Sequence, residues 1–156
     1  MNQRSLSNRL KAIIIGIGIC GLILACIVLP YGGSKLTDVY DIKYWLYLIF
    51  IWVALIPCYA ALMYAWRIAV NIGNNRSFSL DNALLLKKIS NLAVIDSTYI
   101  FVGSVTLLLS PYASAEFFLF TLIIVFAGIS LAIAASALSH LVTKAAELQD
   151  ESDLTI

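Results

Sequence analysis

Four long apolar runs, at residues 12–29, 44–66, 92–110 and 117–140, restrict what this chain can fold into. Folded as a helix with about 1.5 Å of rise per residue, each run matches the ~30 Å hydrocarbon core of a bilayer. Of the 156 residues, 62% are hydrophobic and only 12% are charged, which is more apolar surface than a soluble domain of this size can bury. The sequence therefore predicts an all-α integral membrane four-helix bundle, with residues 1–156 forming a single domain in the lipid bilayer.

The first run also has the form of a secretory signal, because three basic residues precede it within residues 1–11. Residues 23–26, which read I-L-A-C, further suggest a lipoprotein processing site. Against cleavage, residues 27–29 stay apolar where a processed lipoprotein would continue as a polar tether, and three more apolar runs follow. We therefore expect the first run to remain as a membrane helix that ends at Pro30.

The central segment, residues 67–91, is the long hydrophilic break between the runs, and it decides the predicted orientation. It carries four of the ten Lys and Arg residues; the amino-terminal segment carries three, the loop before the second run two, and the carboxyl-terminal tail, residues 144–156, one. Lys and Arg are in excess on the cytoplasmic side of membrane proteins. The predicted orientation therefore has the central segment and both termini in the cytoplasm.

A short amphipathic helix is expected at residues 79–90, running into the third span. Ser79 is a suitable N-cap, and Asp81 lies in the first turn, where the helix dipole favours an anion. Lys87 and Lys88 share the polar side of the helical projection. A basic face of this kind suits the anionic headgroups of the inner leaflet.

Asp96 places a carboxylate inside the third run, roughly 6 Å past its start. An acid at this depth is costly unless it is paired, and it is a common mark of a functional site. The expected partners are Arg67 at the end of the second run and His140 or Ser136 on the fourth. Two interpretations stay open. One is a structural ion pair or hydrogen bond that ties three helices together, favoured because Asp96 lies close to the interface; the other is a role in transport.

A stripe of small residues marks the fourth run, where Gly128, Ala132 and Ser136 follow one another at intervals of four. In lipid, small residues at this spacing let a second helix approach closely. Gly103 on the third run is the expected partner, and a homodimer face is the alternative. The G-x-G-x-x-G pattern at residues 16–21 is interpreted in the same way, because no strand–turn–helix context for nucleotide binding surrounds it.

The carboxyl-terminal tail gathers acidic residues near the end of a helix, where the helix dipole disfavours them. They are therefore expected to meet cations, either by folding back on the central segment or by being held out for a protein partner. The tail residues of interest are Glu147, Asp150, Glu151, Asp153, Leu154, Thr155 and Ile156.

Two stretches resemble a known family. Residues 73–79 read G-N-N-R-S-F-S, with Asn82 and spaced aliphatic residues after them, and residues 147–156 form an acidic run that closes on D-L-T-I. Both resemble the small bacterial four-helix membrane proteins labelled domain of unknown function 2975, although Ser152 stands where that family more often has asparagine. The resemblance implies a location in the bacterial plasma membrane, and it implies no established activity. It does imply a membrane partner for a small Cro-like helix-turn-helix transcription regulator, because such a regulator is often encoded beside family members.

No catalytic or metal-binding pattern is visible in the sequence. It has no nucleophile–base spacing, and its three cysteines all lie in apolar runs. We therefore expect no enzyme activity and no cofactor or metal, and the net charge of +1 gives no reason to expect direct contact with nucleic acid.

The leading prediction is a non-enzymatic multi-pass membrane protein whose cytoplasmic face, meaning Lys87, Lys88 and the tail, binds or controls the regulator. The alternative is a transporter-like or immunity-type membrane protein that acts through Asp96. A homo-oligomer stays open in either case.

Overall fold

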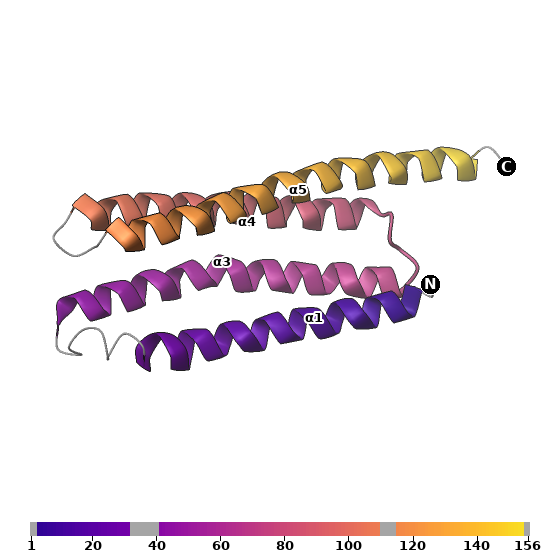
Figure 1. The fold of residues 1–156 in the computed structure, drawn as a ribbon. Helices are drawn as coiled ribbons and strands as arrows, with labels where there is room; N and C mark the ends of the chain where they lie inside the picture. The colour runs from indigo at the N-terminus through magenta and orange to yellow at the C-terminus, as the bar shows by residue number, and fades with distance from the viewer. Residues whose placement is uncertain (1–2, 32–40, 110–114, 155–156) are drawn as a thin grey trace.

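The computed structural model describes residues 3–31, 41–109 and 115–154, and nearly all of them are helical (Figure 1). The elements are α1 (Gln3–Ile23), the π-helical turn η1 (Leu24–Val28), α3 (Ile42–Gly73), α4 (Leu80–Leu109) and α5 (Ala115–Leu154).

Four helices in these ranges are long and apolar enough to cross a membrane. Large apolar side chains such as Ile56 and Phe126 are more than half exposed on their outer faces, and such faces are suited to lipid. The prediction of an all-helical protein with four membrane-spanning candidates is confirmed. The four candidate spans are Gln3–Tyr31, Ile42–Gly73, Leu80–Leu109 and Ala115–Ser152.

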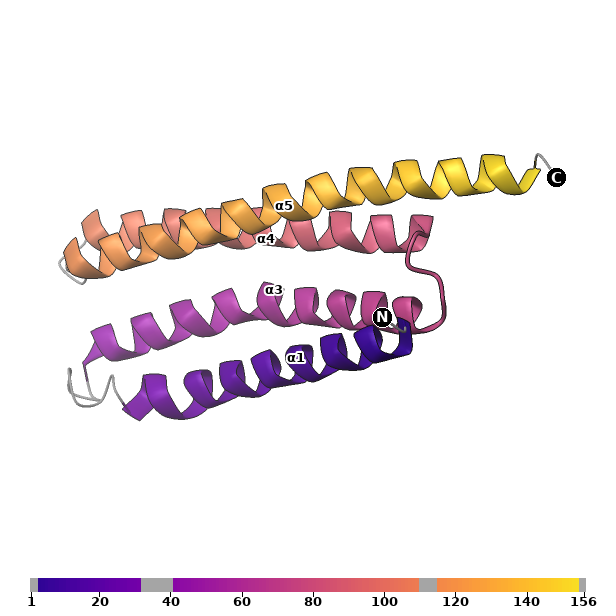
Figure 2. The same ribbon diagram turned by 45° about the vertical axis from the view of Figure 1, so that its right-hand side comes forward.

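The helices pack in the order in which they follow one another along the chain: α1 against α3, α3 against α4, and α4 against α5, which is the most extensive interface. Figures 1 and 2 place α1 and α5 on opposite sides of the molecule. Both views also bring the two described ends of the chain to the end that holds residues 74–79, between α3 and α4. We call this the turn end; α5 extends past the other helices there.

The α1–α3 interface depends on side chains that donate hydrogen bonds to backbone carbonyls of the facing helix. Ser7 Oγ donates to the carbonyl of Ala69 at 2.6 Å. Tyr59 Oη donates to the carbonyl of Gly18 at 2.8 Å. The third such donor is Trp52 Nε1, which donates to the carbonyl of Ala25 at 3.1 Å. Ala25 lies in η1, where the backbone hydrogen bonds follow the π-helical pattern instead of the α-helical one. α1 is therefore held by a few directed bonds.

The end of the first membrane helix differs from the expectation. The helix continues through Pro30 to Tyr31, so Pro30 does not end it. A proline in the last turn of a helix is tolerated in a membrane protein because neighbouring helices can satisfy the carbonyl that its ring frees. Trp52 of α3 lies in such a position, since its Nε1 donates to the carbonyl of Ala25, five residues before Pro30, in the π-helical turn. Tyr44 of α3 satisfies a different carbonyl, that of Pro30 itself near the end of the helix, to which its hydroxyl donates at 3.3 Å.

The α4–α5 interface is built from small residues in a heptad pattern. Buried positions of α5 recur at intervals of three and four, the spacing that keeps one face of a helix against a single partner. Gly128 allows the closest approach, because a Cβ there would collide with Ser97 of α4. The buried α5 residues in this register are Thr121, Val125, Ala132, Ala135, Ser139, Val142 and Ala146.

Two buried serines tie α4 and α5 together in opposite directions. Ser90 Oγ of α4 donates to the carbonyl of Ala132 at 2.8 Å, and Ser139 Oγ of α5 donates to the carbonyl of Ala83 at 2.7 Å. Gly128 and Ala132 of the expected stripe therefore face α4, but Ser136 is exposed and the face continues through Ser139 instead. The next buried position after Ala132 is Ala135, at an interval of three, whereas a strict interval of four predicts Ser136.

Gly103 faces α3, not α5 as expected. A Cβ on Gly103 would collide with the ring of Phe50 in α3. That ring stacks on Tyr99 of α4, with centroids 5.2 Å apart, and meets Phe117 of α5 edge-on at 6.4 Å. An aromatic group thus joins α3, α4 and α5 far from the turn end.

Candidate functional site

Asn82 organises the turn between α3 and α4. Its side chain is 1% exposed, and its Nδ2 donates to the carbonyls of Arg76 at 2.9 Å and Ser77 at 3.0 Å. Its Oδ1 accepts a hydrogen bond from Asn71 Nδ2 of α3 at 2.8 Å. Ser79 Oγ accepts from the backbone N–H of Asn82 at 3.3 Å, as an N-cap of α4 should. One buried amide therefore satisfies loop carbonyls that would otherwise be left unpaired.

Three cations lie at a similar level along the helix axes near the turn end. Arg67 is about 9 Å before the end of α3, and Lys88 is about 12 Å after the start of α4, at 1.5 Å per residue. Lys88 Nζ lies 5.5 Å from the ring centroid of Tyr64. On the other side of α3, Lys11 Nζ lies 5.7 Å from the ring centroid of Trp66. Cations over aromatic rings at this level are typical of the headgroup region of a membrane.

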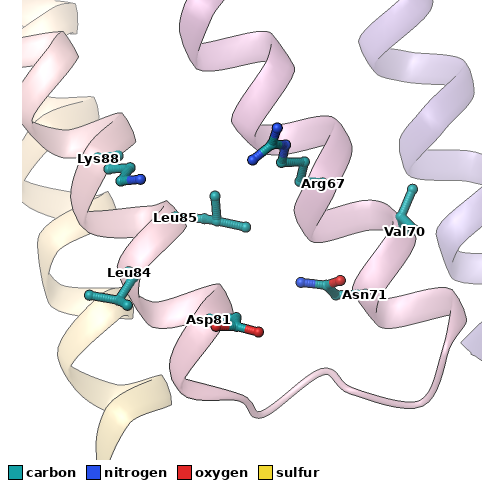
Figure 3. A pocket seen from close by; sticks show the side chains of 7 residues that line it. All are labelled: Arg67, Val70, Asn71, Asp81, Leu84, Leu85 and Lys88. Carbon is teal, nitrogen blue, oxygen red and sulfur yellow. The ribbon is translucent and has the colours of Figure 1, made fainter.

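A cleft of about 370 Å³ separates α3 from α4 at this level, and we call it the α3–α4 cleft. Figure 3 shows Arg67 and Lys88 extending into it from the two helices, with Asn71 and Asp81 nearer to the turn. Apolar side chains form the rest of its wall. The lining residues are Arg67, Val70, Asn71, Asp81, Leu84, Leu85 and Lys88.

A second cleft, the α4–α5 cleft, has a volume of about 440 Å³ and takes up other residues that the sequence singles out. It is lined by Lys87, Ser136 and His140. The adjacent lysines of α4 therefore line different clefts, Lys88 the α3–α4 cleft and Lys87 the α4–α5 cleft. His140 is exposed there. The cleft brings together one cation, one imidazole and several hydroxyl groups.

A third cleft, the turn cleft, lies between residues 74–81 and α5 and has a volume of about 510 Å³. Arg76 and Phe78 line it from the turn, and Gln149 and Asp150 line it from α5. Phe78 is 60% exposed. The lining of this cleft therefore includes an apolar ring, a cation and a carboxylate.

The carboxyl-terminal part of α5 is helical and exposed. Every residue from Glu147 to Ser152 is exposed, including Leu148 at 66%. The helix continues for fifteen residues after Ser139, about 22 Å, and in Figures 1 and 2 its carboxyl-terminal end extends past the ends of the other helices. Asp153 and Leu154 lie in its last turn, while Thr155 and Ile156 fall outside the described residues.

Asp96 is buried between α3 and α4, and its partner is a residue that the sequence analysis did not name. Cys58 Sγ of α3 donates to Asp96 Oδ2 at 3.4 Å. Asp96 Oδ1 is buried and has no hydrogen-bond partner among the described residues. The expected partners lie elsewhere: Arg67 lines the α3–α4 cleft, and His140 and Ser136 line the α4–α5 cleft.

The sequence pattern of the family described as "Protein of unknown function (DUF2975)" matches residues 29–156. The chain belongs to this family. It is also 31% identical, over 161 residues that cover 100% of both chains, to the "Uncharacterized membrane protein YoaS" of Bacillus subtilis (strain 168). No solved structure matches the chain. The resemblance read from the sequence is confirmed, and a membrane location is supported.

The residues matched by the DUF2975 family include the lining of all three clefts, apart from Gln3, which lines the turn cleft. The matched range also contains Asn82, which follows the family-like residues 73–79 and to which the sequence alone assigned no role. Among the residues that the structure describes, no group of three or more His, Cys, Asp or Glu side chains could hold a metal ion. The turn end carries clefts lined by charged residues, exposed apolar side chains and an exposed acidic helix, all of which are features suited to binding.

Proposed function

We propose that this DUF2975 protein is a non-enzymatic membrane protein whose turn end faces the cytoplasm and binds a small, basic helix-turn-helix regulator. The observation that carries the proposal is the exposed acidic helix formed by Glu147, Asp150 and Glu151, which projects beyond the membrane-spanning helices. The excess of Lys and Arg at this end supports the cytoplasmic orientation. The family itself has no stated function, so the partner class rests on the chemistry of this surface and on the family resemblance.

Exposed apolar residues at the same end support a protein partner over lipid. Phe78, Leu80 and Leu148 are each at least half exposed, and they lie on the solvent side of the level set by Arg67 and Lys88. Beyond the headgroups there is no hydrocarbon to cover them, so an apolar patch here is the mark of a protein contact. The turn cleft places Phe78 beside Asp150, an arrangement that suits an anchor side chain with a basic neighbour.

The acidic helix suits a DNA-binding partner because the surface that such a protein presents to phosphates is basic. A regulator held by Glu147, Asp150 and Glu151 would have its DNA-binding surface covered. Membrane binding and DNA binding would then exclude each other, and this exclusion is the mechanism by which the membrane protein would control the regulator.

The test is crosslinking in native membranes, followed by purification in a mild detergent and mass spectrometry. We expect a small basic helix-turn-helix protein with the wild-type chain and its loss with the combined variant E147Q/D150N/E151Q, which removes charge but keeps side-chain size. Glu116→Gln, an acid at the other end of α5, is the matched control and should retain the partner. Equal recovery with the triple variant, or failure of operator DNA to compete with the purified membrane protein, would refute the proposal.

A second candidate function is favoured by one observation: Oδ1 of buried Asp96 has no hydrogen-bond partner in the part of the chain that the structure describes. A carboxylate oxygen without a partner inside a spanning segment suits a transport role, in which a proton or cation occupies it for part of a cycle. Asp96→Asn should then abolish the cellular phenotype while the amount of protein in the membrane stays normal. A neutral effect of this substitution would leave Asp96 with a structural role only.

A further inference from the structure

We propose that the α3–α4 cleft is a binding site for the headgroup of an anionic phospholipid, with Arg67 and Lys88 holding its phosphate. The two side chains come from different helices and extend into the same cleft of about 370 Å³ (Figure 3). Within the described ranges, neither cation forms an ion pair with an acidic side chain. Two cations that share a cleft and form no ion pair of their own are suited to an external anion.

The level of the cleft identifies the source of that anion. Lys88 lies against the ring of Tyr64, and Lys11 lies against the ring of Trp66 on the far side of α3. Aromatic rings with basic neighbours mark the headgroup layer, where Lys and Arg keep their charge in water while their stems cross apolar surface. A phosphate at this level belongs to a lipid already present in the membrane.

The walls of the cleft fit the rest of such a lipid. Val70, Leu84 and Leu85 are apolar and line the same cleft. Each lies nearer to the turn than the cation of its own helix, so they can contact the part of the headgroup beyond the phosphate, while the acyl chains run from the phosphate toward the membrane interior. The remaining charged residue, Asp81, lies nearer to the turn and opposes a phosphate. Two cations and one carboxylate leave a charge of +1, which matches a monoanionic headgroup better than a zwitterionic one.

The neighbouring lysine gives a matched control. Lys87 and Lys88 are adjacent on α4, carry the same charge and are both exposed. Lys88 lines the α3–α4 cleft, whereas Lys87 lines the α4–α5 cleft. A general attraction between basic residues and an anionic membrane would treat the two alike, because each cation near the surface contributes about 1 kcal/mol. The proposed site distinguishes them.

The experiment is native mass spectrometry of the full-length protein released from nanodiscs of phosphatidylcholine that contain phosphatidylglycerol or phosphatidylethanolamine. We expect retained phosphatidylglycerol in preference to phosphatidylethanolamine. Retention should fall roughly fivefold in Arg67→Gln and in Lys88→Gln, which is about 1 kcal/mol each, and should be unchanged in Lys87→Gln. Inorganic phosphate added in solution should not displace the lipid.

A gain-of-function variant keeps the test independent of folding. Asp81→Asn removes the opposing charge from the cleft, so it should retain more phosphatidylglycerol than the wild type. A misfolded protein cannot produce this result. Equal losses in the Lys87 and Lys88 variants, equal retention of the zwitterionic lipid, displacement by inorganic phosphate, or no gain with Asp81→Asn would each overturn the proposal.

Discussion

The two outer helices, α1 and α5, are held to their neighbours in different ways. Within α1 only Ser7 is buried, and directed hydrogen bonds from Ser7 and from aromatic side chains of α3 carry the α1–α3 contact. α5 instead buries a heptad of small residues against α4, and two serines bond across the interface. Close packing over a long face makes α4–α5 the most extensively packed pair of helices, and packing is what drives association of helices in lipid.

The difference agrees with where the candidate surfaces lie. The α4–α5 pair carries the projecting acidic helix and contributes to all three clefts, so a partner would dock on the well-packed half. α1 contributes Gln3 to the turn cleft and Lys11 to the headgroup level. Residues 3–28 of α1 and η1 also precede the range matched by the family pattern. We infer that α4–α5 is the platform and that α1 is a support joined to it through α3.

The largest expected effect comes from enlarging a glycine in the platform. Gly128→Leu would drive a side chain into Ser97 and toward the backbone of Ala93. Overpacking a fitted interface costs about 1–3 kcal/mol and more when backbone must move, so we expect loss of a monodisperse peak in gel filtration and a lower thermal midpoint in detergent.

The matched change in the other half is Gly16→Leu. A Cβ at Gly16 meets nothing within 4 Å, so leucine there should leave the thermal midpoint unchanged or raise it slightly through better helix propensity. If Gly16→Leu destabilised the protein as much as Gly128→Leu, α1 would be packed as closely as α5 and the comparison would fail.

A smaller effect is expected at the turn that joins the two halves. Asn82→Ala removes the donors to the carbonyls of Arg76 and Ser77 and leaves Asn71 without its acceptor. Unpaired buried groups cost roughly 1–3 kcal/mol each, although water entering at the turn end will satisfy part of them. Thermal unfolding should drop accordingly, and protease cleavage within residues 74–79 should accelerate. Ser77→Ala is the control, because among the described residues its hydroxyl donates only to the exposed side chain of Gln3. An unchanged cleavage rate in Asn82→Ala would show that the turn does not depend on this amide.

The sequence predicted the helices well because hydrophobic run length is a local property. It could not predict the contacts of Asp96, which depend on how α3 and α4 are rotated about their axes. The position of Asp96 in its apolar run predicted its depth and so suggested Arg67 and His140 or Ser136 as partners, while the rotation brings Cys58 to the carboxylate. The stripe on α5 failed at Ser136 for a related reason. An interval of four drifts off a facing helix, and only the heptad seen at Ala135 and Ser139 stays on it.

The smallest expected effect comes from removing single hydroxyls, one in each half. Ser139→Ala in α5 and Tyr59→Phe on α3 each delete one hydrogen bond to a carbonyl of the facing helix. Such bonds in membrane proteins average about 0.6 kcal/mol, so global unfolding should barely distinguish the variants.

Local opening should distinguish these two variants. α1 has few other contacts to hold it, so Tyr59→Phe should increase the alkylation rate of exposed Cys20 on α1 in a background where Cys26 and Cys58 are replaced by alanine. In α5 the neighbouring heptad contacts remain in Ser139→Ala, and hydrogen exchange across residues 128–142 should stay close to that of the wild type. If both variants opened their helices equally, the hydroxyls and not the small-residue packing would hold α5, and the distinction between platform and support would have to be abandoned.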